Sequence, residues 1–127
     1  MRKLLLLLSI LITIPVTVLA DFETNKNLVD YCNAYQRILS DEQINPEDVM
    51  KGGRCIGYVE AVYDTAGKVI KDENHKICHI PQNIKSGEVI KNYLTWVEHN
   101  PKKLDLSASS GITLSIGETF CSWKPTP

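Results

Sequence analysis

Several features that mark common functional classes are missing from this sequence. Lysine and arginine never form a cluster larger than two residues, whereas nucleic-acid binding requires a basic face that neutralises phosphates. Internal repeats and low-complexity segments are also absent, which excludes repeat architectures. The segment His-Lys-Ile-Cys-His at 75–79 lacks the first cysteine of a C-x-x-C-H haem-attachment motif. A zinc site there would lack a second pair of ligands at the usual spacing. We therefore expect no cofactor, no metal and no nucleic acid.

Long apolar runs are absent too, except for one at the start of the chain. Leu4–Leu19 is apolar apart from three hydroxyl residues, follows two basic residues and leads into the small residue Ala20. This order predicts a secretory signal peptide over residues 1–20, cleaved after Ala20, with no membrane attachment afterwards. The alternative is an uncleaved anchor, but the run is short for a span of about 20 residues and contains Pro15. The first cysteine is Cys32, so a lipid-modified N-terminus is not expected.

Residues 21–127 form the exported part, and their 107 residues suit a single domain. The chain has 14 basic residues, two of them in the signal peptide, so 12 remain against 15 acidic residues, a net charge of −3. All four cysteines lie in this part, namely Cys32, Cys55, Cys78 and Cys121. An even number in a small exported domain predicts two disulfides and an oxidising compartment such as the bacterial periplasm. Three pairings are possible.

Apolar spacing predicts four helices in two hairpins, so the expected fold is all-α, a small disulfide-linked bundle of about four main helices. Asn45 is a good N-cap for the second helix, and Pro46 suits its first position. The segment 67–83 is expected to be a loop, with a brief turn or strand at 68–71. The helices are expected at 25–39, 46–66, 86–99 and from 105 or 107 to 121. Their inward-facing residues are expected to include Leu28, Cys32, Tyr35, Leu39, Val89, Ile90, Tyr93, Leu94, Val97, Ala108, Ile112, Ile116 and Phe120.

The hairpin arrangement favours one of the three disulfide pairings. Cys32 and Cys55 are nearly level in the first antiparallel hairpin. Cys78 precedes the third helix and Cys121 ends the fourth, so these two meet at one end of the second hairpin. We therefore expect the bridges Cys32–Cys55 and Cys78–Cys121. In the chain-entropy model each such loop closure contributes about 3–4 kcal/mol.

The second predicted helix contains three glycines around Cys55, although an interior glycine costs a helix about 0.5–1 kcal/mol relative to alanine. Gly53 and Gly57 lie two residues before and two residues after this cysteine. A disulfide requires Cα atoms within about 7 Å, which is less than the usual helix separation of about 8–10 Å. We therefore expect Gly53 and Gly57 to allow close helix packing at the bridge.

Cysteine and histidine together suggest one enzymatic alternative, a thiol protease with His75, His79 or His99 as its base. Four paired cysteines leave no thiolate for this chemistry. The acidic pair at 47–48 suits a helix start, and the pair at 72–73 suits a solvated loop. We expect no catalytic residues, and the protein is predicted not to be an enzyme.

Aromatic residues provide candidate interface anchors, because exposed aromatics often carry binding energy. Tyr93 falls on the apolar face of the third helix and is expected in the core. Trp96 is two residues from Leu94 and is expected off that face, at an interface. Trp123 follows the last cysteine and is expected to cover the second disulfide. Tyr58 and Tyr63 are further candidates.

Four segments, taken together, resemble the type VI secretion amidase immunity (Tai) family. They are GGRCIGYVEAVYD at 52–64, ICHIP at 77–81, VIKNYLTWVEHNP at 89–101 and FC at 120–121. The resemblance spans nearly all of the exported part, in the family's order. It implies a small all-helical periplasmic protein, often a homodimer, which binds and inhibits a peptidoglycan amidase effector by occupying its catalytic groove. Protection from self or sibling intoxication is the expected function.

An inhibitor of this kind needs a polar element that fits a groove, and the connection 67–83 is the main candidate. It is long, it is held by Cys78, and it carries Asp72, Glu73 and Asn74. These side chains suit contacts with a catalytic histidine and backbone donors, so we expect them to bind the partner. The surface around Trp96 is the competing candidate. The alternative function is a small periplasmic stress or acid chaperone, although the sequence shows no acid-sensing cluster.

Overall fold

A computed structural model describes residues 23–40, 44–66, 69–71, 77–81, 83–121 and 123. The predicted signal peptide lies outside the described residues, and so do Asp72, Glu73 and Asn74. The elements in chain order are α2 (Asn25–Leu39), α3 (Pro46–Ala66), β1 (Val69–Lys71), β2 (Ile77–His79), α4 (Ser86–His99), the 3-10 turn η2 (Pro101–Lys103) and α5 (Ala108–Phe120). The predicted all-α bundle is confirmed, with helix bounds within a few residues of those expected.

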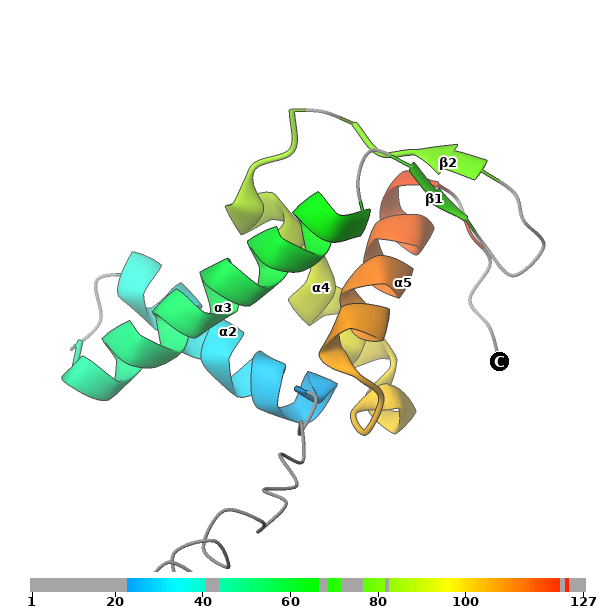
Figure 1. Cartoon of the computed structure of the whole chain (residues 1–127). Coiled ribbons are helices and arrows are strands. Elements are labelled where there is room, and N and C mark those ends of the chain that lie inside the picture. Colours follow the sequence, from blue (N-terminus) through cyan, green and yellow to red (C-terminus); the bar gives the residue numbers. More distant parts are fainter. Residues whose placement is uncertain are drawn as a thin grey trace, which may run out of the picture.

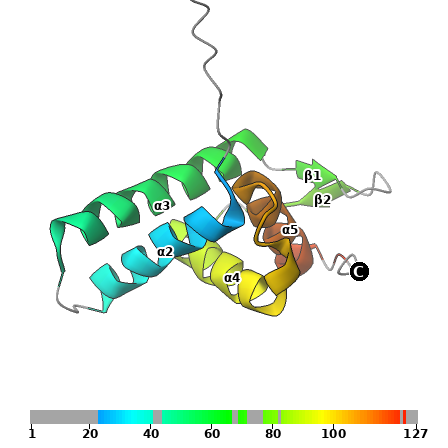
Figure 2. The same ribbon diagram turned by 90° about the horizontal axis from the view of Figure 1, so that it is seen from below.

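The helices are arranged as two packed pairs. α2 and α3 lie side by side, while α4 and α5 pack against this pair and against each other (Figures 1 and 2). The C-terminal end of α2 and the N-terminal end of α3 lie at one end of the molecule, and the small β1–β2 sheet lies at the other. No helix in the described part of the chain is long and apolar enough to cross a membrane.

Short-range caps explain why the helix starts were predictable. The backbone N–H of Asp48 donates to the Asn45 side chain over 2.8 Å, and the Asn45 amide donates back to the Asp48 carboxylate over 3.0 Å. Ser107 caps α5 in the same way, accepting from the N–H of Ser110 over 3.3 Å. Each cap satisfies backbone donors that have no partner inside the helix.

The core contains most of the side chains predicted to face inward. Tyr93 is fully buried as expected, and Leu39 is the clear exception because it is 61% exposed. Leu39 is the last residue of α2, beyond the stretch that the other helices cover. The buried apolar cluster consists of Leu28, Cys32, Cys55, Val59, Ile70, Cys78, Ile80, Val89, Ile90, Tyr93, Trp96, Val97, Ala108, Ile112 and Ile116.

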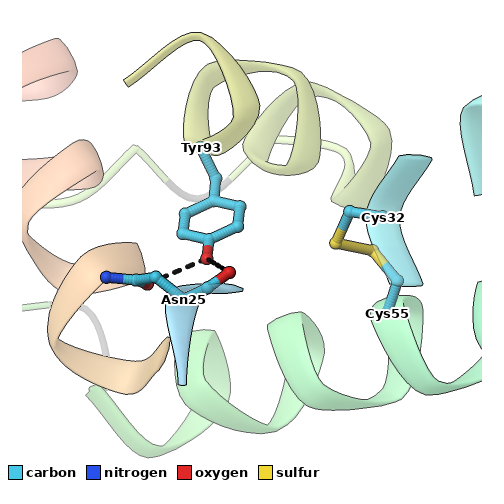
Figure 3. Close-up of a disulfide and its surroundings, with 4 residues drawn as sticks. All are labelled: Asn25, Cys32, Cys55 and Tyr93. Atoms are coloured by element: carbon cyan, nitrogen blue, oxygen red, sulfur yellow. Dashed lines mark hydrogen bonds between the residues drawn. A yellow bond between two sulfur atoms is a disulfide. The ribbon is translucent and has the colours of Figure 1, made fainter. Parts of the chain in front are cut away.

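A buried polar network ties the start of α2 to the second helix pair. The side chain of Asn25 is fully buried and accepts a 2.8 Å hydrogen bond from the Tyr93 hydroxyl (Figure 3). It also donates a hydrogen bond of 2.8 Å to the carbonyl of Lys103. Burial raises the pKa of the Tyr93 phenol, with a further rise from Tyr58. The backbone N–H of Asn25 also donates to the carbonyl of Leu106 over 2.9 Å. Three segments distant in sequence therefore meet at one asparagine.

Both predicted disulfides are present. Cys32 and Cys55 join α2 to α3 with a Cα–Cα distance of 4.9 Å, and both are fully buried (Figure 3). Cys78 of β2 and Cys121 at the end of α5 form the second bridge, with a Cα–Cα distance of 5.6 Å. The first bridge fixes one helix pair, and the second holds the small sheet against the other.

The glycines expected to permit close packing were wrongly chosen. A β-carbon added at Gly53 or Gly57 would meet nothing within 4 Å, and both positions are exposed. One added at Gly52 would lie 2.6 Å from the Ile38 side chain and 3.4 Å from an α2 Cα atom. A helix turns about 100° per residue, so positions two from Cys55 point away from the bridge, whereas the position three before it faces α2. Gly52 therefore allows the close packing.

Candidate partner-binding surface

The β1–β2 sheet is a small hairpin held firmly at its base. Ile70 pairs with Cys78 in the antiparallel register, and both side chains are buried. Ile77 and His79, which flank Cys78 along β2, are exposed. This alternation buries one face of β2 on the bundle and leaves the other face open. The hairpin lies over the end of α5 (Figure 1), where the Cys78–Cys121 bridge fixes it.

β2 was missed in the sequence because the predicted loop has no long alternating pattern. The sequence indicated only a brief turn or strand at 68–71, which corresponds to β1. Three-residue strands such as β2 give too short a signal for period-two alternation. Two neighbouring features, a strand at 69–71 and a cysteine at 78, were the available clues to a hairpin.

Hydrogen bonds also fix the segment that follows the hairpin. The Tyr63 hydroxyl of α3 donates to the carbonyl of Pro81 over 2.8 Å. The Ser86 hydroxyl, in the first turn of α4, donates to the Glu60 carboxylate over 2.7 Å. Tyr63, one of the aromatic interface candidates, is thus half-buried and used to position this segment. The chain that leaves β2 is therefore held against α3.

The three residues predicted to bind the partner belong to the connection of this hairpin. Asp72, Glu73 and Asn74 follow β1 directly, and the connection begins and ends at the paired residues Lys71 and Ile77. Because these three lie outside the described residues, their role stays a prediction. The described strands establish where the connection attaches, at one end of the bundle.

Trp96 is not an exposed interface anchor, so that prediction is wrong. Its side chain is only 6% exposed and belongs to the core cluster. It lies seven residues after Val89 and three after Tyr93, which places it on the buried stripe of α4. The prediction took Leu94 as the reference for the apolar face, but Leu94 is only half-buried and lies at the edge of the buried stripe. The Lys103 ammonium lies 5.5 Å from the centre of a Trp96 ring.

A second surface, which the sequence analysis did not identify, surrounds the α2–α3 turn. We call it the turn patch; its exposed apolar residues are Leu39, Ile44, Val49 and Met50. They are four of the six most exposed large apolar side chains in the described residues. Exposed apolar groups gathered at one end of a small protein often mark a contact with another protein. The turn patch lies opposite the hairpin (Figures 1 and 2).

Ion pairs stabilise the base of the turn patch. Arg37 of α2 pairs with the buried carboxylate of Asp48 in the first turn of α3. The hydrogen bond from Arg37 lowers the pKa of Asp48 below its usual 3.8, against burial, and the charges of Arg37 and Lys51 lower it further. Lys51 contacts Glu47 over 2.8 Å and Asp30 over 2.9 Å, and these contacts raise its pKa. Asp48 is therefore more than a helix-start residue, because it also joins α3 to α2.

The described residues do not bring together the groups needed for metal or thiol chemistry. Within them no group of three histidine, cysteine or acidic side chains suits a metal ion. All four cysteines are used in the two disulfides, so a thiol nucleophile is not available. What the geometry presents is a disulfide-anchored hairpin and an apolar patch at opposite ends. An exposed apolar patch of this kind often marks a contact surface for another protein.

A comparison with protein families identifies the family of this chain. The family model described as Rap1a immunity proteins matches residues 24–121, and the chain belongs to this family of type VI secretion immunity proteins. The matched region runs from the cap of α2 to the last cysteine, so it includes both disulfides and the hairpin. No curated protein and no solved structure matches the chain.

Proposed function

We propose that this protein is a periplasmic immunity protein that binds and inhibits a peptidoglycan amidase delivered by type VI secretion. The family supports binding to an effector, and the resemblance to the Tai family supports an amidase as that effector. The single observation that carries the proposal is the hairpin at one end of the bundle, held by the Cys78–Cys121 bridge.

An anchored hairpin suits insertion into a catalytic groove. The buried side chains of Ile70, Cys78 and Ile80 fix its base, and the Tyr63 hydrogen bond fixes the segment beyond it. A preorganised element loses less conformational entropy on binding than a free loop. The sequence between β1 and β2 contains two carboxylates, Asp72 and Glu73, and one amide, Asn74. These groups complement a catalytic histidine and backbone N–H donors.

The periplasmic location is supported by the signal-peptide pattern at 1–20 and by the two disulfides. Disulfides persist in oxidising compartments, where an injected amidase would reach the cell wall. We also propose a homodimer, because the turn patch offers an apolar surface for a second copy. The same patch is the one observation that favours the chaperone alternative, because chaperones expose apolar surface.

Co-expression tests this function directly. Candidate type VI amidases are directed to the periplasm of a sensitive strain, with and without this protein, and survival is measured. We expect protection against one such effector and inhibition of that purified amidase. A variant without residues 2–20 should not protect, because it stays on the wrong side of the membrane. A chaperone would instead protect against acid without effector specificity, and failure to bind any amidase would reject the proposal.

The role of the hairpin connection needs its own variant. Replacing Asp72, Glu73 and Asn74 together by alanine should weaken inhibition at least tenfold, or ~1.4 kcal/mol, without loss of helical structure. The matched control replaces Asn33, Glu98 and Asp105, an amide and two carboxylates that are exposed elsewhere. The control should inhibit normally. Equal inhibition by both triple variants would place the interface on another surface.

A further inference from the structure

The two disulfides of this protein differ in what they hold and in how exposed they are. Cys32 and Cys55 are fully buried between α2 and α3, two helices that also pack closely against each other (Figure 3). Cys78 of β2 is 9% exposed, and Cys121 at the end of α5 is partly exposed. A thiol in solution therefore has access to the Cys78–Cys121 bridge and not to the other one.

Few other contacts hold the β1–β2 hairpin on the bundle. Within the described residues, neither strand packs along a helix in the way that the helices pack along one another. No backbone hydrogen bond in that part of the chain joins either strand to a helix. The remaining contacts are the buried side chains of Ile70 and Ile80 and the hydrogen bond from Tyr63 to the carbonyl of Pro81. The Cys78–Cys121 bridge is thus the one covalent cross-link between the hairpin and the helices.

The hairpin and the bundle consequently depend on different bridges. β1 and β2 have three residues each, and an isolated two-stranded hairpin is at best marginally stable in water. The α2–α3 pair, in contrast, has its own buried bridge and most of its contacts within the helical core. Regions with few buried contacts open at a lower free energy than the rest of a protein. Loss of the Cys78–Cys121 bridge should therefore release the hairpin first.

We propose that the Cys78–Cys121 bridge is a redox switch for partner binding. In the oxidised protein it holds the hairpin in one position over the end of α5 (Figure 1). In the reduced protein the hairpin is free, while the Cys32–Cys55 bridge keeps α2 and α3 together. The consequence for binding rests on the proposed function, in which the hairpin enters the effector. The release of the hairpin itself does not.

The switch is opened by a small-molecule thiol such as reduced glutathione. Its thiolate attacks the Sγ atom of Cys121, the more exposed of the two sulfurs; the S–S bond breaks, and Cys78 leaves as a thiolate and takes up a proton. A second thiolate attacks the glutathione sulfur of the mixed disulfide and releases Cys121 as a thiol. Two glutathione molecules are thereby oxidised to one disulfide, and the protein is reduced by two electrons. The same steps in reverse, with oxidised glutathione, close the bridge.

Amide hydrogen exchange tests the release of the hairpin without any effector. The disulfide-bonded protein is compared by NMR with a Cys78→Ala/Cys121→Ala variant in which Cys32 and Cys55 remain paired. Tyr63→Phe, which removes only the hydrogen bond to Pro81, is the matched control for a non-covalent contact. If the double variant does not fold, the wild-type protein is treated with limiting glutathione and alkylated once Cys78 and Cys121 are free.

We expect exchange in β1 and β2 to become at least about tenfold faster relative to α2 and α3 when the bridge is absent. Tyr63→Phe should change this ratio less. An equal increase in exchange for strands and helices would overturn the proposal, because the bridge would then stabilise the whole fold. Unchanged exchange of the strands, or an equal effect of Tyr63→Phe, would also overturn it.

Effector inhibition tests the consequence for binding. With the amidase found by co-expression, the oxidised protein should inhibit at least about tenfold better than the Cys78→Ala/Cys121→Ala variant, because a fixed hairpin loses less entropy on binding. Reduced glutathione should weaken inhibition by the wild-type protein, oxidised glutathione should restore it, and neither should affect the variant. Full inhibition by the variant would refute the switch and leave the immunity function intact. Failure to find an amidase would reject the proposed function without changing the exchange result.

Discussion

Replacing Gly111 by alanine is expected to destabilise the protein, although alanine is the better helix former. Gly111 is buried in the first turns of α5 and faces the start of α2. A β-carbon there would overlap the side-chain amide of Asn25, with Cγ and Nδ2 each 2.7 Å away and Oδ1 closer still. The amide of Asn25 must then leave the position from which it bonds to Tyr93 and Lys103.

The size of the effect follows from what Asn25 loses. It makes two side-chain hydrogen bonds of 2.8 Å, each worth about 0.5–1.5 kcal/mol net. Leaving a buried amide or hydroxyl unpaired adds about 1–3 kcal/mol, while the gain in helix propensity returns about 1 kcal/mol. The free energy of unfolding should therefore fall by about 2–4 kcal/mol. For a domain of this size the Tm would fall by about 10 °C or more.

Urea unfolding followed by far-UV circular dichroism, with the disulfides intact, measures this change. Gly57→Ala is the matched control, because its β-carbon meets nothing within 4 Å. It should stabilise the protein by about 0.5–1 kcal/mol. In an Asn25→Ala background the obstacle is gone, so Gly111→Ala should no longer destabilise. The reasoning is refuted if Gly111→Ala matches Gly57→Ala, or if its cost is unchanged when Asn25 is alanine.

Two further predictions concern pH and redox conditions. The folded-state pKa of Asp48 lies below its usual 3.8, so its contribution to stability is present above that value and is lost as the pH falls through the lower folded pKa. Asp48→Asn should flatten the dependence of Tm on pH below pH 3.8. An unchanged profile would exclude the Arg37–Asp48 ion pair as the source of this pH dependence. Limited reduction should open Cys78–Cys121 before Cys32–Cys55, because Cys121 is partly exposed whereas both cysteines of the other bridge are fully buried. Thiol alkylation followed by peptide mapping gives the order, and earlier labelling at 32 and 55 would contradict it.

Features that depend on neighbouring residues were determined by the sequence alone. Asn45 and Ser107 mark helix starts because their side chains bond to backbone groups within one turn. The inward face of α4 could be predicted because Val89, Tyr93 and Val97 repeat at helical spacing. The disulfide pairing followed once the helices were placed in two hairpins. The helix starts and the inward face of α4 require no knowledge of distant contacts, and the pairing required only the order of the helices.

The tertiary structure decided which element each face meets. Gly52, rather than Gly53 or Gly57, is the close-packing glycine because it alone of the three faces α2. Trp96, by contrast, lies seven residues after Val89 and three after Tyr93, so its burial could have been predicted from helical spacing. The network at Asn25 joins residues 68 and 78 positions apart. Such contacts depend on how separate helices pack together, and short-range sequence patterns do not specify that arrangement.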